Sequence, residues 1–173
     1  MNRLKMSKDD AYYLHQTPTE LAKKLIEIVP LQVGDVVYEP FRGEGAFYNS
    51  LPSTIVPKWS ELVEGRDYKD FNESYDWVIT NPPFRLQEQE KRVNSFWLLM
   101  DYFTDRATKG VAFLGNDQCF SALTPARIKK LADKGWYIQT IHVCAVKKWR
   151  GRYFFLVLSK KPSTLYSALS GTY

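Results

Sequence analysis

The fold is decided by residues 36–45, VVYEPFRGEG, together with residues 75–84, YDWVITNPPF. Each stretch begins with β-branched and aromatic residues, which favour a buried strand. Each then ends in glycines or prolines, which mark a turn. Helical patterns precede and follow these two stretches. Strands that alternate with helices predict an α/β fold with a mostly parallel sheet and helices on both of its faces.

The surrounding elements follow from hydrophobic spacing and turn residues. Thr17 is positioned to cap a first helix, with Pro18 in the first turn and Glu20 completing a capping box. The last two predicted strands have no helix between them, so we expect them to pair as an antiparallel hairpin. The remaining predicted elements are helices at residues 46–51, 93–103 and 124–134, and strands at residues 59–63, 111–114, 137–146 and 153–158.

Length and composition point to one soluble domain. The chain has 173 residues, of which 45% are hydrophobic and 25% charged, as in ordinary globular proteins. No uninterrupted apolar run is long enough to span a bilayer, and the N-terminus lacks the apolar core of a signal peptide. We therefore expect a single domain over residues 1–173, located in the cytoplasm and without contact with a membrane.

Metal and disulfide chemistry is not expected. Two cysteines, Cys119 and Cys144, are too few for a disulfide scaffold or a four-cysteine zinc site. Together with the histidines His15 and His142, they do not suggest a zinc centre. We interpret all four side chains as structural and expect no bound metal.

Charge is divided unevenly along the chain. Lys and Arg number 24 against 19 Asp and Glu, which gives a formal net charge of +5. Residues 1–90 hold 10 basic and 15 acidic side chains, whereas residues 91–173 hold 14 basic and 4 acidic ones. A basic half within a small domain predicts a polyanionic partner such as nucleic acid. The alternative is a basic face that is only solvated.

The loop at residues 39–45 carries two glycines and two glutamates directly after a predicted strand, where α/β sheets bind ligands. It lacks the Gly-Lys-Ser/Thr of a phosphate-binding loop, and Tyr48 stands where the dinucleotide-binding fingerprint has its third glycine. Glu39 and Glu44 would also repel a pyrophosphate. The loop therefore favours a ligand with a positive charge. The alternative is an ordinary turn whose glycines serve only its geometry.

Asn81, Pro82, Pro83 and Phe84 follow the second of the two deciding strands. The prolines fix the backbone and lack N–H donors, which leaves the carbonyls of Asn81 and Pro82 as acceptors. A rigid site with an amide oxygen, a backbone carbonyl and an aromatic ring suits a planar amine, which donates two hydrogen bonds while its own ring stacks on the phenyl group. The alternative is a proline-rich turn that only ends a strand.

At these two motifs, the sequence resembles the S-adenosylmethionine-dependent amino-methyltransferases, especially the N6-adenine DNA methyltransferases. Residues 39–45 look like their acid-Pro-x-x-Gly-x-Gly cofactor motif, residues 81–84 look like their catalytic Asn/Asp-Pro-Pro-aromatic motif, and residues 15–18 look like their N-terminal motif that helps hold the methionine carboxylate. The resemblance implies a Rossmann-like methyltransferase fold and S-adenosylmethionine as cofactor. The implied catalytic residues are Asn81, Pro82, Pro83 and Phe84, and the implied cofactor contacts are Thr17, Pro18, Glu39, Pro40, Phe41, Gly43, Gly45, Glu61, Asp67 and Asn81.

The same resemblance implies individual roles. Glu39 would accept from the cofactor ammonium, and Asp67 would contact the cofactor adenine. An acid after the second strand, Glu61 or else Glu64, would accept from the ribose hydroxyls. The implied reaction is direct in-line transfer of a methyl group to the exocyclic N6 of a flipped-out adenine in DNA. The alternatives are RNA base N-methylation at adenine N6 or guanine N2, protein-glutamine methylation, and a catalytically silent nucleic-acid-binding subunit.

Cations interleaved with aromatic residues occupy residues 147–153, between the last two predicted strands. Cations bind phosphates and aromatic rings stack on bases, so this loop predicts a nucleic-acid contact, with a merely solvated hairpin as the alternative. The stretch after the last strand is too short for a separate target-recognition domain. We therefore expect loops, a homodimer or a partner subunit to supply target recognition. The predicted nucleic-acid-binding residues are Arg85, Lys147, Lys148, Trp149, Arg150 and Arg152.

Overall fold

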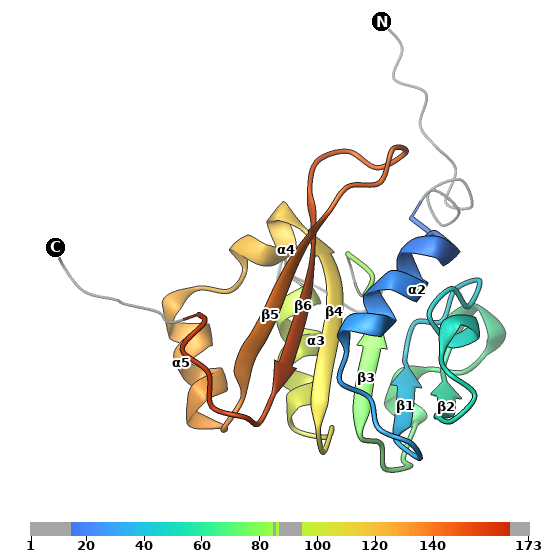
Figure 1. Ribbon diagram of the computed structural model, residues 1–173, viewed down its shortest axis with the longest axis horizontal. Helices are drawn as coiled ribbons and strands as arrows, with labels where there is room; N and C mark the ends of the chain where they lie inside the picture. The colour runs from blue at the N-terminus through green and yellow to red at the C-terminus, as the bar shows by residue number, and fades with distance from the viewer. Residues whose placement is uncertain (1–14, 85, 87–94, 167–173) are drawn as a thin grey trace, which may run out of the picture.

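The computed structural model describes residues 15–84, 86 and 95–166. Its six strands form one sheet and are β1 (Val36–Glu39), β2 (Val56–Trp59), β3 (Trp77–Thr80), β4 (Gly110–Asn116), β5 (Tyr137–Cys144) and β6 (Tyr153–Ser159). The sheet order is β2-β1-β3-β4-β6-β5 (Figure 1). Strands β1 to β4 are parallel, whereas β6 is antiparallel to both of its neighbours, β4 and β5. The predicted mostly parallel sheet with a C-terminal antiparallel hairpin is confirmed.

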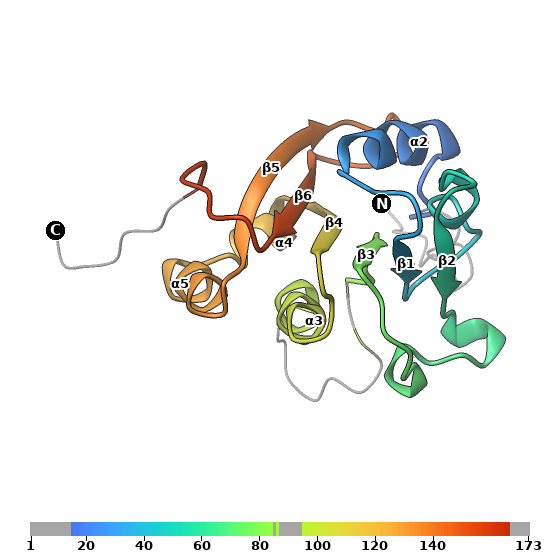
Figure 2. The same ribbon diagram turned by 60° about the horizontal axis from the view of Figure 1, so that its bottom comes forward.

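Helices cover both faces of this sheet, as predicted. The helices are α2 (Thr19–Ile28), α3 (Ser95–Thr104), α4 (Asp117–Ser121) and α5 (Pro125–Asp133), and the 3₁₀ turns are η1 (Tyr48–Ser50), η2 (Leu62–Glu64) and η3 (Tyr68–Asp70). Helix α2 lies on one face of the sheet, while α3 and α5 lie on the other (Figure 2). None of the described helices is long and apolar enough to cross a membrane.

The central strands bury alternate side chains in two apolar clusters, one on each face. On β3, Trp77 and Ile79 belong to the cluster that contains α2, while Val78 belongs to the cluster that contains α3. Successive side chains of a strand point to opposite faces, so a strand covered on both faces is apolar throughout. Residues 77–80 and 110–115 are accordingly buried at every position, which explains why their sequences predict strands clearly.

Some element boundaries differ from the predicted ones. Strand β2 occupies residues 56–59 rather than 59–63, because it lies at the sheet edge and its exposed or half-exposed residues show little hydrophobic pattern. The helix predicted at residues 46–51 is only the 3₁₀ turn η1. Helix α4 has no predicted counterpart, since five residues are too few to show helical periodicity.

The start of α2 also differs from the prediction. Pro18, not Thr17, is the N-cap residue, and no side chain caps the helix. Glu20 forms an ion pair with Lys23 instead of closing a capping box. The Thr17 hydroxyl accepts a hydrogen bond from Asn81, 64 residues away, so a tertiary contact has replaced the expected local cap.

The ends of the strands bring distant loops to one edge of the sheet. The carboxyl ends of β1 to β4 point to the edge at the top of Figure 1, and the loop that joins β5 to β6 rises over the same edge. In open α/β sheets, ligands bind at this carboxyl edge. The glycine loop after β1, the tetrapeptide after β3 and the cationic loop after β5 are therefore positioned at one end of the molecule.

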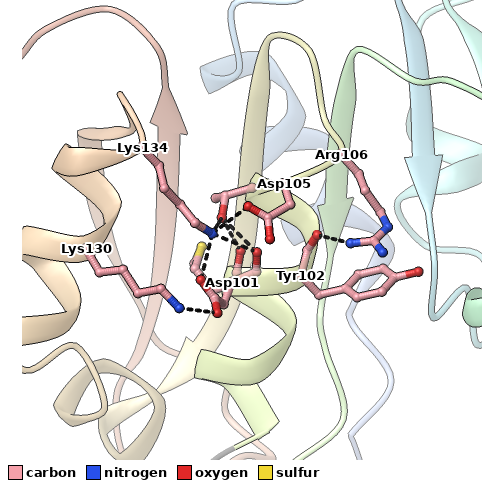
Figure 3. Close-up of polar contacts among 8 residues, drawn as sticks. Asp101, Tyr102, Asp105, Arg106, Lys130 and Lys134 are labelled. Carbon is pink, nitrogen blue, oxygen red and sulfur yellow. Dashed lines mark hydrogen bonds and ion pairs between the residues drawn. The ribbon is translucent and has the colours of Figure 1, made fainter.

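An ion-pair cluster joins α3 to α5 on the face opposite α2 (Figure 3). Lys134 Nζ lies 2.7 Å from Asp101 Oδ1 and 2.7 Å from Asp105 Oδ1, and Lys130 Nζ lies 2.7 Å from Asp101 Oδ2. Burial opposes the charge on Asp101, but hydrogen bonds from the two lysines hold its pKa below the usual value. The side chains of Lys134 and Asp101 are 22% and 26% exposed, so water screens this pair less than a surface pair.

We predict that Lys134→Met lowers the free energy of unfolding at pH 7 by about 1–2 kcal/mol, between the values for exposed and buried ion pairs. The pKa of Asp101 is lower in the folded than in the unfolded protein. Its stabilisation is therefore present above the normal aspartate pKa and is lost as the pH falls below about 4. Chemical denaturation at pH 7 and near pH 3 measures both effects.

The matched control is Lys129→Met, which removes an exposed ion pair with Asp133. This change should alter the free energy of unfolding by less than about 0.5 kcal/mol. Equal losses for the two variants at pH 7 would contradict the prediction.

Candidate functional site

A hollow with a volume of about 820 Å³ opens at the carboxyl edge of the sheet. This main hollow is within the range of about 300–1,000 Å³ that is typical of small-molecule sites. Both sequence motifs contribute to its wall. The lining residues are His15, Gln16, Thr17, Glu39, Pro40, Phe41, Arg42, Gly43, Ala46, Glu61, Leu62, Val63, Asp67, Tyr68, Lys69, Asn81, Pro82, Pro83, Phe84, Leu86 and Leu98.

The glycine loop is held by contacts that a larger residue would break. Gly43 has a φ of +53°, and a Cβ atom there would lie 2.4 Å from Gln16 Oε1. Its N–H donates to Glu61 Oε2 at 2.6 Å, while the Glu44 N–H donates to Gln16 Oε1 at 3.0 Å. A side chain at position 43 would therefore displace the Gln16 amide from its hydrogen bond, and the positive φ would strain any residue other than glycine.

Two buried glutamates lie beside this loop. Glu39 is 3% exposed and its Oε2 accepts from the Tyr48 N–H at 2.8 Å, while Glu61 is 7% exposed and accepts from Gly43. Burial raises the pKa of Glu39 well above its usual value, although the Tyr48 N–H and the charge of Arg42 oppose the shift. A cation next to Glu39 would favour its ionised form. The hollow therefore suits a ligand with a positive charge at this end.

Glu61 and Glu64, the two acids that follow the second strand, have different environments in the structure. Glu61 lines the main hollow, whereas Glu64 forms an ion pair with Arg42. The guanidinium carbons of Arg42 and Arg66 each lie 3.8 Å from the centre of the Trp59 ring. These contacts join the glycine loop to the loop after β2. Sequence reasoning missed them because Arg42 and Glu64 are 22 residues apart and leave no local pattern.

The wall near Glu61 is largely apolar. Leu62 and Val63 are 46% and 78% exposed and line the main hollow. The rings of Phe41 and Tyr68, with centroids 5.1 Å apart, line it as well. Asp67 adds one carboxylate, whose Oδ1 accepts from the backbone two residues further on at 3.0 Å. Apolar surface beside carboxylate acceptors suits a nucleoside, which combines a flat ring with hydroxyl donors.

Asn81 is fixed by the chain segment that precedes α2. Its Nδ2 donates to the His15 carbonyl at 3.2 Å and to Thr17 Oγ1 at 3.3 Å. An amide nitrogen has two protons to donate. Because both acceptors engage Nδ2, the amide oxygen Oδ1 is the atom that can accept from a ligand.

The rest of the tetrapeptide forms the rim between β3 and α3. The Pro83 carbonyl accepts from Ser95 Oγ at 2.6 Å, which ties the turn to the start of α3. Phe84 is 38% exposed, and its ring packs edge-on against His15 with centroids 5.1 Å apart. A partly exposed ring that is held on one side can stack on a flat ligand with its open face.

A second hollow of about 390 Å³ shares His15 and Phe84 with the main hollow. The amide side chains of Asn116 and Gln118 line it, and Asn116 Oδ1 accepts from the Cys119 N–H at 3.1 Å. The sequence predicts no role for these two amides, although Asn116 ends β4 at the same edge and Gln118 follows it. The other lining residues are Lys148, Trp149, Arg150 and Tyr153.

The cationic loop at residues 147–153 borders this second hollow. The side chains of Lys147, Lys148 and Arg150 are exposed. Arg152 Nε lies 3.5 Å from Asp117 Oδ1, so part of its charge is neutralised within the chain. The first three cations are therefore the stronger candidates for binding an anion.

Trp149 is not the exposed stacking residue that the sequence predicts. It is 6% exposed, belongs to the apolar cluster that contains α2, and packs against Tyr153 with ring centroids 4.4 Å apart. Burying a large aromatic ring is more favourable than leaving it in water.

Pro18 and Gly45 do not line the main hollow: Pro18 starts α2, and Gly45 shapes the glycine loop with a φ of +83°. Arg85 lies outside the described residues.

No protein-family model and no curated protein matches this chain. Its fold matches solved structures. A protein from Listeria monocytogenes assigned to the class I S-adenosylmethionine-dependent methyltransferases aligns with a TM-score of 0.60 and 15% identity, over 88% of this chain and 62% of that one. One from Pyrococcus horikoshii assigned as an RNA methyltransferase aligns with a TM-score of 0.61 and 17% identity, over 91% and 93%. The M protein of the type I restriction enzyme EcoKI aligns with a TM-score of 0.59 and 14% identity, over 86% and 44%.

These similarities establish the fold. At 14% to 17% identity they show that the chain has the Rossmann-like fold of the class I methyltransferases, as the sequence predicts. The chain spans 62% of the length of the Listeria protein and 44% of that of the EcoKI M protein. The chemistry of this chain must therefore be argued from its own site.

We predict that Glu39→Gln raises the free energy of unfolding at pH 8 by on the order of 1 kcal/mol, the scale of a buried polar group with incomplete hydrogen bonding. Burial raises the pKa of Glu39 in the folded protein. As the pH rises, the unfolded protein therefore loses this proton at a lower pH than the folded protein does. The stability of the wild type then falls as the pH rises above the normal glutamate pKa. The difference in the free energy of unfolding between the variant and the wild type should shrink towards pH 4.5, as measured by chemical denaturation.

Glu27→Gln, on the exposed side of α2, is the control and should change the free energy of unfolding at pH 8 by less than about 0.5 kcal/mol. A Glu39→Gln protein that is less stable than the wild type at pH 8 would show that the carboxylate is stabilising where it lies.

Proposed function

We propose that this chain transfers a methyl group from S-adenosylmethionine to the exocyclic amino group of a nucleic-acid base, with adenine N6 in DNA as the first candidate. One observation carries the proposal: a single hollow is lined both by the acidic glycine loop around Glu39 and by residues 81–84. The first suits a cationic ligand and the second a planar amine. Direct transfer needs such a shared space, because donor and acceptor must meet in one geometry.

The residues of the main hollow fit S-adenosylmethionine. Glu39 would accept from its ammonium group, and the positive charge would favour the ionised carboxylate. Glu61 would accept from the ribose hydroxyls, while Asp67, Leu62 and Val63 would surround the adenine. When bound, the cofactor would supply an electrophilic methyl group: the acceptor nitrogen would bond to the methyl carbon, the electron pair of the broken carbon–sulfur bond would stay on sulfur, and the nitrogen would lose one of its protons to water.

Residues 81–84 would prepare the acceptor amine. Its lone pair is delocalised into the base, which makes the nitrogen a poor nucleophile. Hydrogen bonds from its two protons to Asn81 Oδ1 and the Pro82 carbonyl would favour a pyramidal nitrogen with a directed lone pair, while Phe84 stacks on the ring. Positioning and fixed dipoles then supply most of the rate enhancement.

We further propose that the base enters from the second hollow. A base in a duplex must be flipped out to reach Asn81. Phe84 and His15 belong to both hollows, so a base that passes the second hollow reaches the stacking ring directly. Lys148 and Arg150 line the second hollow and would bind the adjoining phosphates.

The same site suits the amino groups of DNA bases and of RNA bases. Phosphate-binding cations act on DNA and RNA alike, and adenine N6 or guanine N2 in RNA presents the same planar amine to Asn81. Target recognition by a second copy of the chain or by a partner subunit belongs to the same proposal. The test of activity therefore includes DNA, RNA and protein as acceptors.

We predict that the wild-type chain incorporates labelled methyl groups from S-adenosylmethionine into DNA, recovered as N6-methyladenine after digestion to nucleosides. Asn81→Ala should lower the rate by about 100-fold or more, the usual effect of removing a group that stabilises the transition state. Asn72→Ala, which changes an exposed amide, is the control. Incorporation that survives in Asn81→Ala would exclude this catalytic role, and incorporation into RNA or protein alone would reassign the acceptor.

We predict that replacing Lys147, Lys148 and Arg150 together by Ala weakens nucleic-acid binding and flattens its salt dependence. Each lost phosphate contact should reduce the slope of log K against log salt by about 0.9 on duplex DNA. Replacing Lys129, Lys160 and Lys161 removes the same charge from exposed positions outside the two hollows and is the control. Equal slopes for the two triple variants would remove the cationic loop from the binding surface.

A further inference from the structure

Residues 15–17, here named the bracket, contact both halves of the candidate site. On one side, Gln16 Oε1 accepts from the Glu44 N–H of the glycine loop at 3.0 Å. On the other, the His15 carbonyl and the Thr17 hydroxyl accept from Asn81 Nδ2 at 3.2 and 3.3 Å. The bracket thus connects the loop after β1 to the side chain at the end of β3.

The contacts with Asn81 select one orientation of its amide. A terminal amide can turn over by 180°, which exchanges its oxygen with its NH₂ group. In the turned-over state, an NH₂ group would face the N–H protons of an acceptor amine, donor against donor. The His15 carbonyl has no proton to donate, so it can bind Nδ2 but not the amide oxygen, whereas the Thr17 hydroxyl accepts from Nδ2 and fixes the position of the side chain. The bracket therefore holds Nδ2 on its own side and leaves Oδ1 for the acceptor amine.

We propose that His15 and Thr17 are positioning residues for the Asn81 amide, and that Thr17 acts on the methyl-transfer step rather than on affinity for the cofactor. This inference rests on the proposed function. It assigns Thr17 a different task from the cofactor contact that the sequence resemblance implies. The backbone carbonyl of His15 supplies the second acceptor and cannot be removed by a side-chain change.

The same geometry favours Asn over Asp at position 81. An aspartate has no proton to donate at neutral pH. The Thr17 hydroxyl could rotate to donate to it, but the His15 carbonyl would then face a carboxylate, acceptor against acceptor. Asn81→Asp should therefore lose the bracket contact at His15 while keeping the shape of the side chain.

The kinetic test uses Thr17→Val, which keeps the shape of the side chain and removes the hydroxyl acceptor. We expect kcat to fall by about 10- to 100-fold, the scale of a slight misplacement of a reacting group. The dissociation constant for S-adenosylhomocysteine, measured by calorimetry, should change by less than about threefold, a loss of under 1 kcal/mol. Thr17→Ser restores the acceptor and should recover kcat. Thr19→Val, an exposed position at the start of α2, is the matched control.

The opposite pattern would overturn the inference. If Thr17→Val weakens S-adenosylhomocysteine binding while kcat is unchanged, Thr17 is a cofactor ligand and not a positioning residue. If Thr17→Ser loses as much activity as Thr17→Val, the hydroxyl is not the group that matters. Thermal unfolding of each variant separates these effects from a failure to fold.

A second readout does not depend on activity. In protein labelled with ¹⁵N at asparagine, the Asn81 side-chain NH₂ signal is identified by its absence in Asn81→Ala. Thr17→Val should shift this signal and speed the exchange of its protons with water, whereas Thr19→Val should leave it in place. An unchanged signal in Thr17→Val would overturn the bracket contact. A wild type that transfers no methyl group to any acceptor, but shows the expected NMR change, would overturn the proposed function and leave the bracket contact standing.

Discussion

The parallel pairing of β1 with β3 is the constraint on which the rest of the site depends. In this pairing Val37 lies opposite Trp77 and Tyr38 lies opposite Val78. Because the strands are parallel and in this register, the glycine loop and residues 81–84 leave the sheet at the same edge and at nearly the same level. If β3 ran the other way, Asn81 would end up at the opposite edge. The main hollow exists because two adjacent strands stop together.

The same burial that stabilises the sheet gives the site its electrostatic character. Glu39 ends a strand that is covered on both faces, so its carboxylate is 3% exposed and its pKa is raised. The second hollow, by contrast, is lined by Lys148 and Arg150. The acidic half of the chain thus supplies the carboxylates of the main hollow, and the basic half supplies the cations of the second hollow. The two neighbouring hollows therefore favour ligands of opposite charge. Phe84 and His15 form the wall that they share, which is where a cationic donor and a polyanionic acceptor would have to meet.

Local sequence patterns predict the strands correctly where both faces of the strand are buried. They fail where the role of a side chain depends on a contact with a distant part of the chain. Strands β3, β4 and β6 are covered on both faces, so their apolar runs predict them well. Strand β2 lies at the edge, where the sequence predicts a strand at residues 59–63 and the structure has it at residues 56–59. Thr17 looks like a helix cap in the sequence, yet its hydroxyl accepts from Asn81. Trp149 looks like a stacking residue in an exposed loop, yet it completes an apolar cluster.

The sequence by itself determined the α/β fold, because strand and helix patterns alternate along it. It also determined the glycine loop and the tetrapeptide at residues 81–84, because each is a short stretch of neighbouring residues that follows a recognisable strand. It also indicated an acidic end and a basic end. Only the tertiary structure decided that Glu61 lines the main hollow while Glu64 pairs with Arg42, and that His15 and Thr17 accept hydrogen bonds from Asn81. These outcomes depend on which side chains meet across loops that are tens of residues apart, and that meeting is set by strand order and register rather than by any local pattern.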